Sequence, residues 1–255
     1  MKQIYRLKGN EKIYLLPISD LHVGSPEFNE EYFEYCLDTI DSITSVKRIY
    51  LLGDLVESAS KQIGNSSFKS IMDGEDQLDY VIDRLRPYKR DIVSTVMGNH
   101  EARLSKEFNF DINRIIGRAL KIPSGSQFTD EISINQQPIK IYTAHGKGSS
   151  AYHYTAQSKI IRDTQHIAAN ILMHGHNHRC DHFSIPQMGL VDGHLDIIRK
   201  HYVFSGSFLR YKGYASGMLL PPLPEAFIQL SINKDLRVRS NRFNIDECKH
   251  DLMEL

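Results

Sequence analysis

The sequence predicts an α/β protein whose strands form a parallel sheet. Residues 12–19 and 48–53 are short apolar runs that end in polar turns, as buried strands do. Between them, residues 28–44 place apolar side chains at helical spacing. A helical pattern at 77–88 and a third apolar run at 92–98 continue the alternation. Strands that alternate with helices in this way form βαβ units, which build parallel sheets.

The later elements have signals of their own. Pro87 ends the helix at 77–88, because proline cannot continue the hydrogen-bond ladder of a helix. The stretch "ISINQQPIKIYTAHG" predicts a hairpin over residues 132–146 with its turn near Asn135–Pro138. The remaining expected elements are helices at 112–122 and 156–170 and strands at 171–175, 201–208 and 226–245, the last with a turn at Asn233–Asp235.

The composition is typical of a globular protein, and we expect a single domain over residues 1–255. Apolar residues make up 41% of the chain and charged residues 24%, with 31 basic and 31 acidic side chains. A chain without net charge is a poor candidate for binding nucleic acid through bulk electrostatics, although a local basic rim can still do so. No apolar run approaches the ~18 residues of a membrane span, the first residues do not resemble a signal peptide, and the three cysteines are widely separated. We therefore expect a cytoplasmic protein without membrane contact.

The stretch "MHGHNH" (173–178) places histidines at 174, 176 and 178, directly after an apolar run. A spacing of two is the side-chain period of an extended strand, although glycine at 175 allows the backbone to turn. Several imidazoles close together are typical of a metal site.

Similar polar groups follow other expected strands. Binding sites in an open parallel sheet lie at the carboxyl ends of its strands. Carboxylates, imidazoles and amide oxygens together suit borderline divalent metals. Five segments supply such groups: "SDLHVG" with Asp20 and His22, "LGDLVES" with Asp54, "MGNHEAR" with Asn99, His100 and Glu101, "TAHGKG" with His145, and "HGHNH" with His176 and His178.

In this order, the patterns D-x-H, G-D, G-N-H-[DE], H and G-H-x-H resemble those of the calcineurin-like metallophosphoesterase superfamily. The matching segments run from about residue 18 to residue 178. The resemblance implies a four-layer αββα sandwich, in which two mixed β-sheets face each other and helices cover the outside. The strand-rich last third of the chain fits the second sheet.

The resemblance also implies two divalent metal ions. By position, the ligands fall into two sets: Asp20, His22 and His178 for one ion, and Asn99, His145 and His176 for the other. Asp54 would bridge the ions, since a carboxylate can share its oxygens between cations ~3.5–4 Å apart. Ligands of these types accept manganese, iron, zinc or nickel, and we expect manganese.

Two residues of "GNHE" would act without holding metal. The resemblance makes His100 the group that hydrogen-bonds a phosphate oxygen or protonates the leaving oxygen. Glu101 would orient that imidazole, the alternative being a plain surface acid. A hydroxide that the metal pair generates from water would attack phosphorus in line. His174 has no role in this scheme and is expected to be an ordinary strand residue, the alternative being a partner of a metal ligand.

The substrate is less clearly indicated. "GDLVESAS" lacks the second aspartate and the arginine of the G-D-x-x-D-R-G form found in phosphoprotein phosphatases. "SDLHVG" and "GDL" resemble the forms of repair nucleases and bacterial phosphodiesterases, and "GNHEAR" with "HGKG" is similar to small metallophosphoesterases of bacteria and phages. We therefore expect a phosphodiesterase that acts on nucleotides or nucleic acid, DNA or RNA. The alternatives are a phosphomonoesterase or phosphoprotein phosphatase, a catalytically silent scaffold, and a structural site with a single zinc.

Basic and aromatic residues near these segments are candidates for substrate contacts. Arg103 follows His100 by three positions, and Lys147 lies beside His145. Lys61 and Lys69 lie in a long polar loop at 57–76, a length typical of a functional or disordered connection. Stacking on a nucleobase is a further possibility for Tyr152 and Tyr154.

Overall fold

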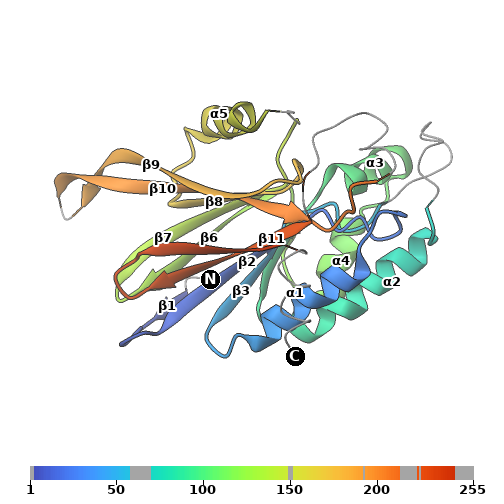
Figure 1. The fold of residues 1–255 in the computed structure, drawn as a ribbon, viewed down its shortest axis with the longest axis horizontal. Helices are drawn as coiled ribbons and strands as arrows, with labels where there is room; N and C mark the ends of the chain where they lie inside the picture. Colours follow the sequence, from blue (N-terminus) through green and yellow to red (C-terminus); the bar gives the residue numbers. More distant parts are fainter. Residues whose placement is uncertain are drawn as a thin grey trace.

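The computed structural model describes residues 3–57, 70–148, 152–191, 193–212, 223 and 225–244. Within these ranges the strands follow one continuous hydrogen-bonded order, β1-β6-β7-β8-β10-β11-β2-β3-β4-β5, with β9 paired to β10 and β12 to β11. The order folds into two sheets that are joined through β10 (Figure 1). The first sheet contains β1 (Gln3–Tyr5), β6 (Gln127–Ile134), β7 (Gln137–Ala144), β8 (Ile171–His174), β9 (Cys180–Val191) and β10 (His194–Ser207). The second contains β2 (Lys12–Ile18), β3 (Lys47–Leu51), β4 (Ile92–Val96), β5 (Ser124–Gly125), β11 (Ala226–Asn233) and β12 (Val238–Asn244).

Both sheets are mixed. In the second sheet β2, β3, β4 and β5 pair in parallel, as the alternation of strands and helices predicts, whereas β11 is antiparallel to β2 and β12. In the first sheet β8 pairs in parallel with β7 and β10, whereas the β6–β7 and β9–β10 hairpins are antiparallel. The expected pair of mixed sheets is confirmed.

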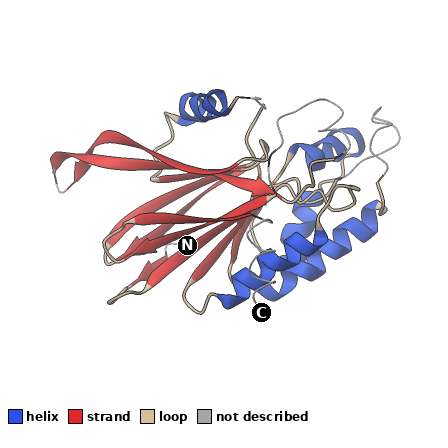
Figure 2. Cartoon of the chain, in the orientation of Figure 1, coloured by secondary structure: helices blue, strands red, loops and turns tan. Residues whose placement is uncertain are grey.

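Helices cover the two outer faces (Figure 2). The helices are α1 (Glu30–Ser42), α2 (Gly74–Leu85), α3 (Asn99–Phe108), α4 (Ile112–Leu120) and α5 (His153–Thr164), with a 3₁₀ turn η1 (Arg86–Tyr88) after α2. Buried residues of α1, α2 and α4 share one apolar cluster with β2 and β3 of the second sheet. Ala156 and Ile160 of α5 pack instead on the first sheet.

Side-chain alternation along the strands creates the layers. In β8, Ile171 and Met173 face the core between the sheets, while Leu172 faces α5. In β3, Tyr50 faces the same inner core, while its neighbours face α1 and α2. Burial of one large aliphatic side chain contributes about 1.5–3 kcal/mol, so β3 and β8 are stabilised on both faces. The layer order is helices, sheet, sheet, helix, which confirms the four-layer sandwich.

Local sequence explains where several helices begin and end. Asn29 and Asp73 cap α1 and α2 by accepting backbone N–H groups of the first turn. The expected helix at 156–170 is wrong in its bounds, because α5 begins at His153 and ends at Thr164. Nζ of Lys200, on β10, donates to the carbonyl oxygens of Thr164 and Ile167, at 3.1 and 2.7 Å. It thereby satisfies carbonyl groups at the end of α5 and in the turn that follows.

Two features were not anticipated from the sequence. Helix α3 begins inside "GNHE" and contains few apolar residues, with Arg103 and Lys106 exposed. Its signal was Glu101 at the third helical position, whose carboxylate accepts the N–H of Gly98, which is one half of a capping box. All of β9 pairs with β10 up to Ser205, and the two strands form a hairpin that extends beyond the other strands (Figure 1). Residues 58–69 of the long polar loop lie outside the described residues.

Among the residues described, no helix is both long and apolar enough to cross a bilayer.

Gly206 allows β10 to pass from the first sheet to the second. Upstream of it β10 pairs with β8, and at Gly206 and Ser207 it pairs with β11. Gly206 has φ +92°, and a Cβ atom there would lie 1.7 Å from the carbonyl oxygen of Ala226. The junction therefore requires a residue without a side chain.

We expect Gly206→Ala to destabilise the fold severely, because the methyl group and the backbone of β11 cannot both be accommodated. Gly193, in the turn before β10, is a matched control: it has φ +84°, and a Cβ atom there would meet no described atom within 4 Å. Gly193→Ala should cost only the backbone strain, about 1–3 kcal/mol. Thermal unfolding measures both, and equal losses would contradict this account.

Candidate metal centre

The predicted site residues lie on loops at the carboxyl ends of the parallel strands. Asp20 and His22 follow β2, and Asp54 follows β3. The remaining ones are Asn99 and His100 at the start of α3, His145 after β7, and His176 and His178 after β8. The structure brings these side chains together from five distant segments.

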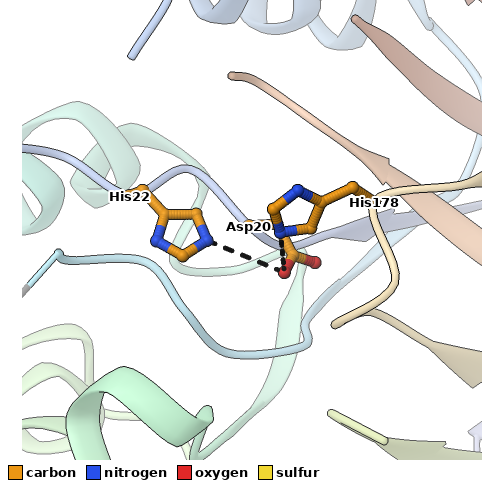
Figure 3. Close-up of side chains that lie close together, drawn as sticks. All are labelled: Asp20, His22 and His178. Carbon is orange, nitrogen blue, oxygen red and sulfur yellow. Dashed lines mark ion pairs between the residues drawn. The ribbon is translucent and has the colours of Figure 1, made fainter. Parts of the chain in front are cut away.

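The first group consists of Asp20, His22 and His178 (Figure 3). Oδ1 of Asp20 lies 3.9 Å from Nε2 of His22 and 3.3 Å from Nε2 of His178. Oδ2 of Asp20 accepts the N–H of His176, at 2.9 Å, and the hydroxyl of Ser19, so this carboxylate is held in one orientation. One atom from each residue lies within 4.8 Å of the others, as ligands of one ion must.

The second group consists of Asp54, His145 and His176, with Asn99 beside them. Nε2 of His145 lies 3.2 Å from Oδ2 of Asp54 and 3.0 Å from Oδ1 of Asn99. Nδ1 of His176 lies 2.7 Å from the same Asn99 oxygen. The amide oxygen therefore faces two imidazoles at once.

Asp54 lies between the two groups. Its Oδ1 accepts the backbone N–H of His100 at 2.8 Å. Its Oδ2 faces Nε2 of His22 at 3.8 Å and Nε2 of His145 at 3.2 Å, one nitrogen from each group. One oxygen of Asp54 therefore faces both groups of candidate ligands.

The hydrogen bonds around the histidines indicate that a cation fits here. Nδ1 of His22 donates to Oε2 of Glu57 at 2.9 Å, and Nδ1 of His145 donates to the carbonyl oxygen of Leu52 at 2.7 Å. In the neutral form of each ring, Nε2 then carries a lone pair. Nε2 of His22 is buried without a hydrogen-bond partner among the described residues. Lone pairs that converge with carboxylate oxygens repel one another unless a positive charge lies among them, and histidines that donate their other N–H in this way are typical metal ligands.

The electrostatics of the site agree with that conclusion. Burial alone raises the pKa of Asp54, but hydrogen bonding and the charges of His145, His22 and His100 lower it overall. Burial alone lowers the pKa of His145, but Asp54 and the charge of Asp20 raise it to about 9. The buried carboxylates therefore favour positive charge at this position.

The backbone is unusual at the same residues. Asp20, His22 and Asp54 have φ values of +54°, +51° and +50°, and His176 and His178 have +70° and +55°. Residues other than glycine rarely adopt the left-handed region, and such strain collects at functional sites. The turns direct these side chains inward from the strand ends.

Glu57 is a functional residue that the sequence analysis missed. Its buried carboxylate contacts His22, at 2.9 Å, and lies 3.4 Å from Nδ1 of His100. Nδ1 of His100 also donates to the carbonyl oxygen of Glu57 at 2.8 Å. Burial alone lowers the pKa of His100, but Glu57 and Asp54 raise it to about 9, which keeps the imidazole cationic. One ring nitrogen of His100 also lies within 4.8 Å of a nitrogen of His22 and an oxygen of Asp54, close enough for the three atoms to surround one cation.

The expected role of Glu101 is corrected by these contacts. Glu57, rather than Glu101, contacts the ring of His100. Glu101 is buried, so it is not a surface acid either, and its carboxylate accepts the backbone N–H groups of Asp54, Leu55 and Gly98 at 3.0, 2.7 and 2.9 Å. It clamps the turn after β3 to the start of α3 and thereby places Asp54.

Of the described residues predicted to contact substrate, one lies beside the candidate metal centre and the others are exposed on helices or at a helix start. Lys147 lines a cavity next to His145, whereas Arg103 is exposed on α3 and is not among the described residues that line this cavity. Tyr152 and Tyr154, at the start of α5, are 77% and 81% exposed. Lys61 and Lys69 lie outside the described residues.

The sequence profile of calcineurin-like phosphoesterases matches residues 14–206, a span that contains all of the candidate ligands. The chain belongs to the calcineurin-like phosphoesterase family. It is therefore a metal-dependent phosphoesterase, a hydrolase of phosphoester bonds, and the clustered side chains are candidate ligands for the divalent metal that such phosphoesterases use.

Individual similarities to this phosphoesterase are more distant. The DNA polymerase II small subunit of Pyrococcus furiosus is 30% identical over 103 residues, which cover 36% of this chain and 17% of that protein. Vacuolar protein sorting 29 of Cryptosporidium parvum is 13% identical, with a TM-score of 0.48, covering 92% of this chain and 100% of that one. A metallophosphoesterase from Sphaerobacter thermophilus is 14% identical, with a TM-score of 0.43, covering 94% of this chain and 93% of that one.

We expect Glu57→Gln to lower the affinity for Mn²⁺ by about 10–100-fold, because His22 loses the carboxylate that orients its ring and increases its basicity. Competition with a chelator, followed by calorimetry, measures this change. Glu11→Gln is the control, since Glu11 is exposed and its carboxylate accepts, among the described residues, the N–H of its near neighbour Lys8 alone. Equal affinities of the two variants would show that Glu57 does not position His22.

Glu101→Gln should lower stability by about 1–3 kcal/mol, because an amide NH₂ would replace one oxygen that accepts backbone N–H groups. Chemical denaturation compares this variant with Glu11→Gln. A loss of kcat without any loss of stability would instead support the role predicted from the sequence, in which Glu101 orients the ring of His100.

Proposed function

We propose that this phosphoesterase hydrolyses phosphodiesters of nucleotides or nucleic acid at a centre of two divalent cations. The observation that supports a pair of ions is the position of Asp54, whose Oδ2 faces one imidazole of each ligand group. We propose Asp20, His22 and His178 as ligands of one ion, Asn99, His145 and His176 as ligands of the other, and Asp54 as the bridge. Manganese is the proposed metal, with iron, zinc and nickel as the alternatives that the same ligands accept.

Cations held at these positions supply Lewis-acid activation of water and charge neutralisation at phosphorus. The chain's own contribution is a proton donor. Glu57 fixes His100 through Nδ1, which leaves Nε2 free to donate a proton to the departing alkoxide. Asp54 also accepts the backbone N–H of His100, so the donor and the proposed bridge are held as one unit.

The charge around the centre favours a diester substrate. A diester phosphate carries one negative charge, whereas a monoester carries about 1.5–2 at neutral pH. Among the described residues, Lys147 and Lys159 are the lysines that line the neighbouring cavity, and Lys159 is paired with Asp163 at 2.6 Å. Beyond the proposed cations and His100, the cavity therefore adds little positive charge, which agrees with a substrate of single negative charge. The partial similarity to a DNA polymerase subunit agrees with a nucleic-acid substrate.

A substrate comparison with Mn²⁺ supplied tests the proposal. We expect a higher kcat/KM for bis-p-nitrophenyl phosphate than for p-nitrophenyl phosphate. The opposite preference would favour the phosphomonoesterase alternative, which the form "GNHE" also allows. Retention of close to two metal equivalents without hydrolysis of any ester would favour a scaffold, and a single equivalent of zinc would favour a structural site.

Two substitutions separate metal binding from proton donation. Asp54→Ala should remove most bound metal and abolish activity, because both ligand groups lose their shared carboxylate. His100→Ala should retain metal and lower kcat by about 10²–10⁴-fold. Metal analysis and steady-state kinetics measure these effects, with His194→Ala on the exposed β9–β10 hairpin as the control. Wild-type turnover by His100→Ala would exclude it as the donor.

A further inference from the structure

A cavity of about 960 Å³ opens beside the candidate metal centre and runs beneath α5. Asn99, His145 and His176 line its end at the centre. Ala156 and Ile160 of α5 line it farther away. Its volume lies in the upper part of the range for sites that enclose a small ligand, roughly 300–1,000 Å³.

The first sheet forms one wall of the cavity. Ala144, His174 and Phe204 occupy the same register position on β7, β8 and β10, near the carboxyl ends of β7 and β8. Because side chains alternate along β8, His174 points to the α5 side, opposite to Met173 in the inner core. His145 follows Ala144 directly, and His176 follows His174 by two residues. The wall is therefore continuous with the proposed ligands.

The ring of His174 contains a buried polar atom that lacks a hydrogen bond within the described part of the chain. The residue is 7% exposed, and its Nε2 has no hydrogen-bond partner among the described residues. A buried polar atom that lacks a hydrogen bond costs about 1–3 kcal/mol, so such atoms normally have one. The ring of His174 lines the cavity, but Nε2 itself has almost no exposed surface, so a ligand becomes its partner only when the ring turns toward the cavity.

The remaining walls combine aromatic and polar groups. Tyr142 and Phe204 supply aromatic rings, and the hydroxyl of Tyr142 donates to Gln127 at 2.8 Å. Lys147 lines the cavity two residues after His145. An aliphatic ligand would leave His174 unsatisfied, whereas a nucleobase offers a flat ring for the aromatic groups and donors and acceptors along its edge.

We propose that this cavity binds the nucleoside part of a nucleotide phosphodiester, with the base beneath α5 and His174 as a residue that determines specificity. This inference rests on the proposed function. The scissile phosphate then lies at the end formed by Asn99, His145 and His176. A base enclosed beneath a helix cannot remain in a duplex, so the substrate is a small nucleotide diester or the end of a single strand.

Two diesters with the same leaving group test the inference: thymidine 5′-p-nitrophenyl phosphate and methyl p-nitrophenyl phosphate. We expect wild type to prefer the nucleoside ester by at least about tenfold in kcat/KM, the effect of one or two hydrogen bonds and a stacked ring. Ala156→Trp fills the cavity from α5 and should reduce this ratio toward one. Ser158→Trp places the same side chain on the exposed face of α5 and should preserve the ratio. His174→Leu should lower the ratio about fivefold.

Binding of thymidine 5′-monophosphate, measured by calorimetry, gives a readout that does not require turnover. We expect wild type and Ser158→Trp to bind it and Ala156→Trp to lose binding at a temperature where circular dichroism shows the variant folded. The unfolding temperature of Ala156→Trp should fall, because Ala156 also packs on the first sheet. Equal ratios and equal binding for all variants would overturn the inference and leave the hydrolase proposal intact. Loss of binding in Tyr154→Ala rather than Ala156→Trp would place the base on the exposed start of α5 and would also overturn it. Binding without hydrolysis of either ester would support the cavity while refuting the proposed function.

Discussion

The position of the Asp54 carboxylate is the constraint on which the rest of the centre depends. One oxygen is fixed by the N–H of His100 and the other faces an imidazole from each side. The Glu101 carboxylate accepts the backbone N–H of Asp54. Gly98 allows the start of α3 to approach Asp54 closely, since a Cβ atom at Gly98 would lie 2.1 Å from the Asp54 nitrogen. The packing of α3 against the turn after β3 therefore determines where the two ligand groups meet.

The same arrangement concentrates titratable groups in a buried site. Asp20 and Asp54 are buried, and the positive charge that they require comes either from protonated imidazoles or from a cation bound by the neutral rings. Burying a charge is unfavourable unless an opposite charge is close. Because the unfolded chain cannot offer this arrangement, binding of a cation should be coupled to the stability of the fold. The left-handed turns at the ligands are tolerated because the surrounding strands hold them in place.

Strand β8 connects the core, the cavity and the centre. Met173 packs between the sheets, His174 lines the cavity beneath α5, and His176 lies among the candidate ligands. The histidine-rich stretch therefore contributes to both the cavity and the candidate metal centre. Side chains alternate along the strand, and glycine at 175 then lets the backbone turn. If the cavity binds a nucleoside as we propose, the adjacent positions of His174 and His176 would hold the base and the phosphate at a defined distance from each other.

The sequence by itself determined the features that depend on local pattern. Apolar periodicity predicted β2, α1, β3, α2 and β4 close to their observed bounds, and polar residues after these strands predicted which side chains gather. Only the tertiary structure decided which carboxylate hydrogen-bonds to which histidine. Glu57 lies 35 positions from His22, and their contact depends on how β2 packs beside β3, whereas Glu101, adjacent to His100 in sequence, is turned by the helix toward backbone amides. Hydrophobic and turn signals act over a few residues, but a site and its cavity arise where distant segments meet, and that is decided by packing.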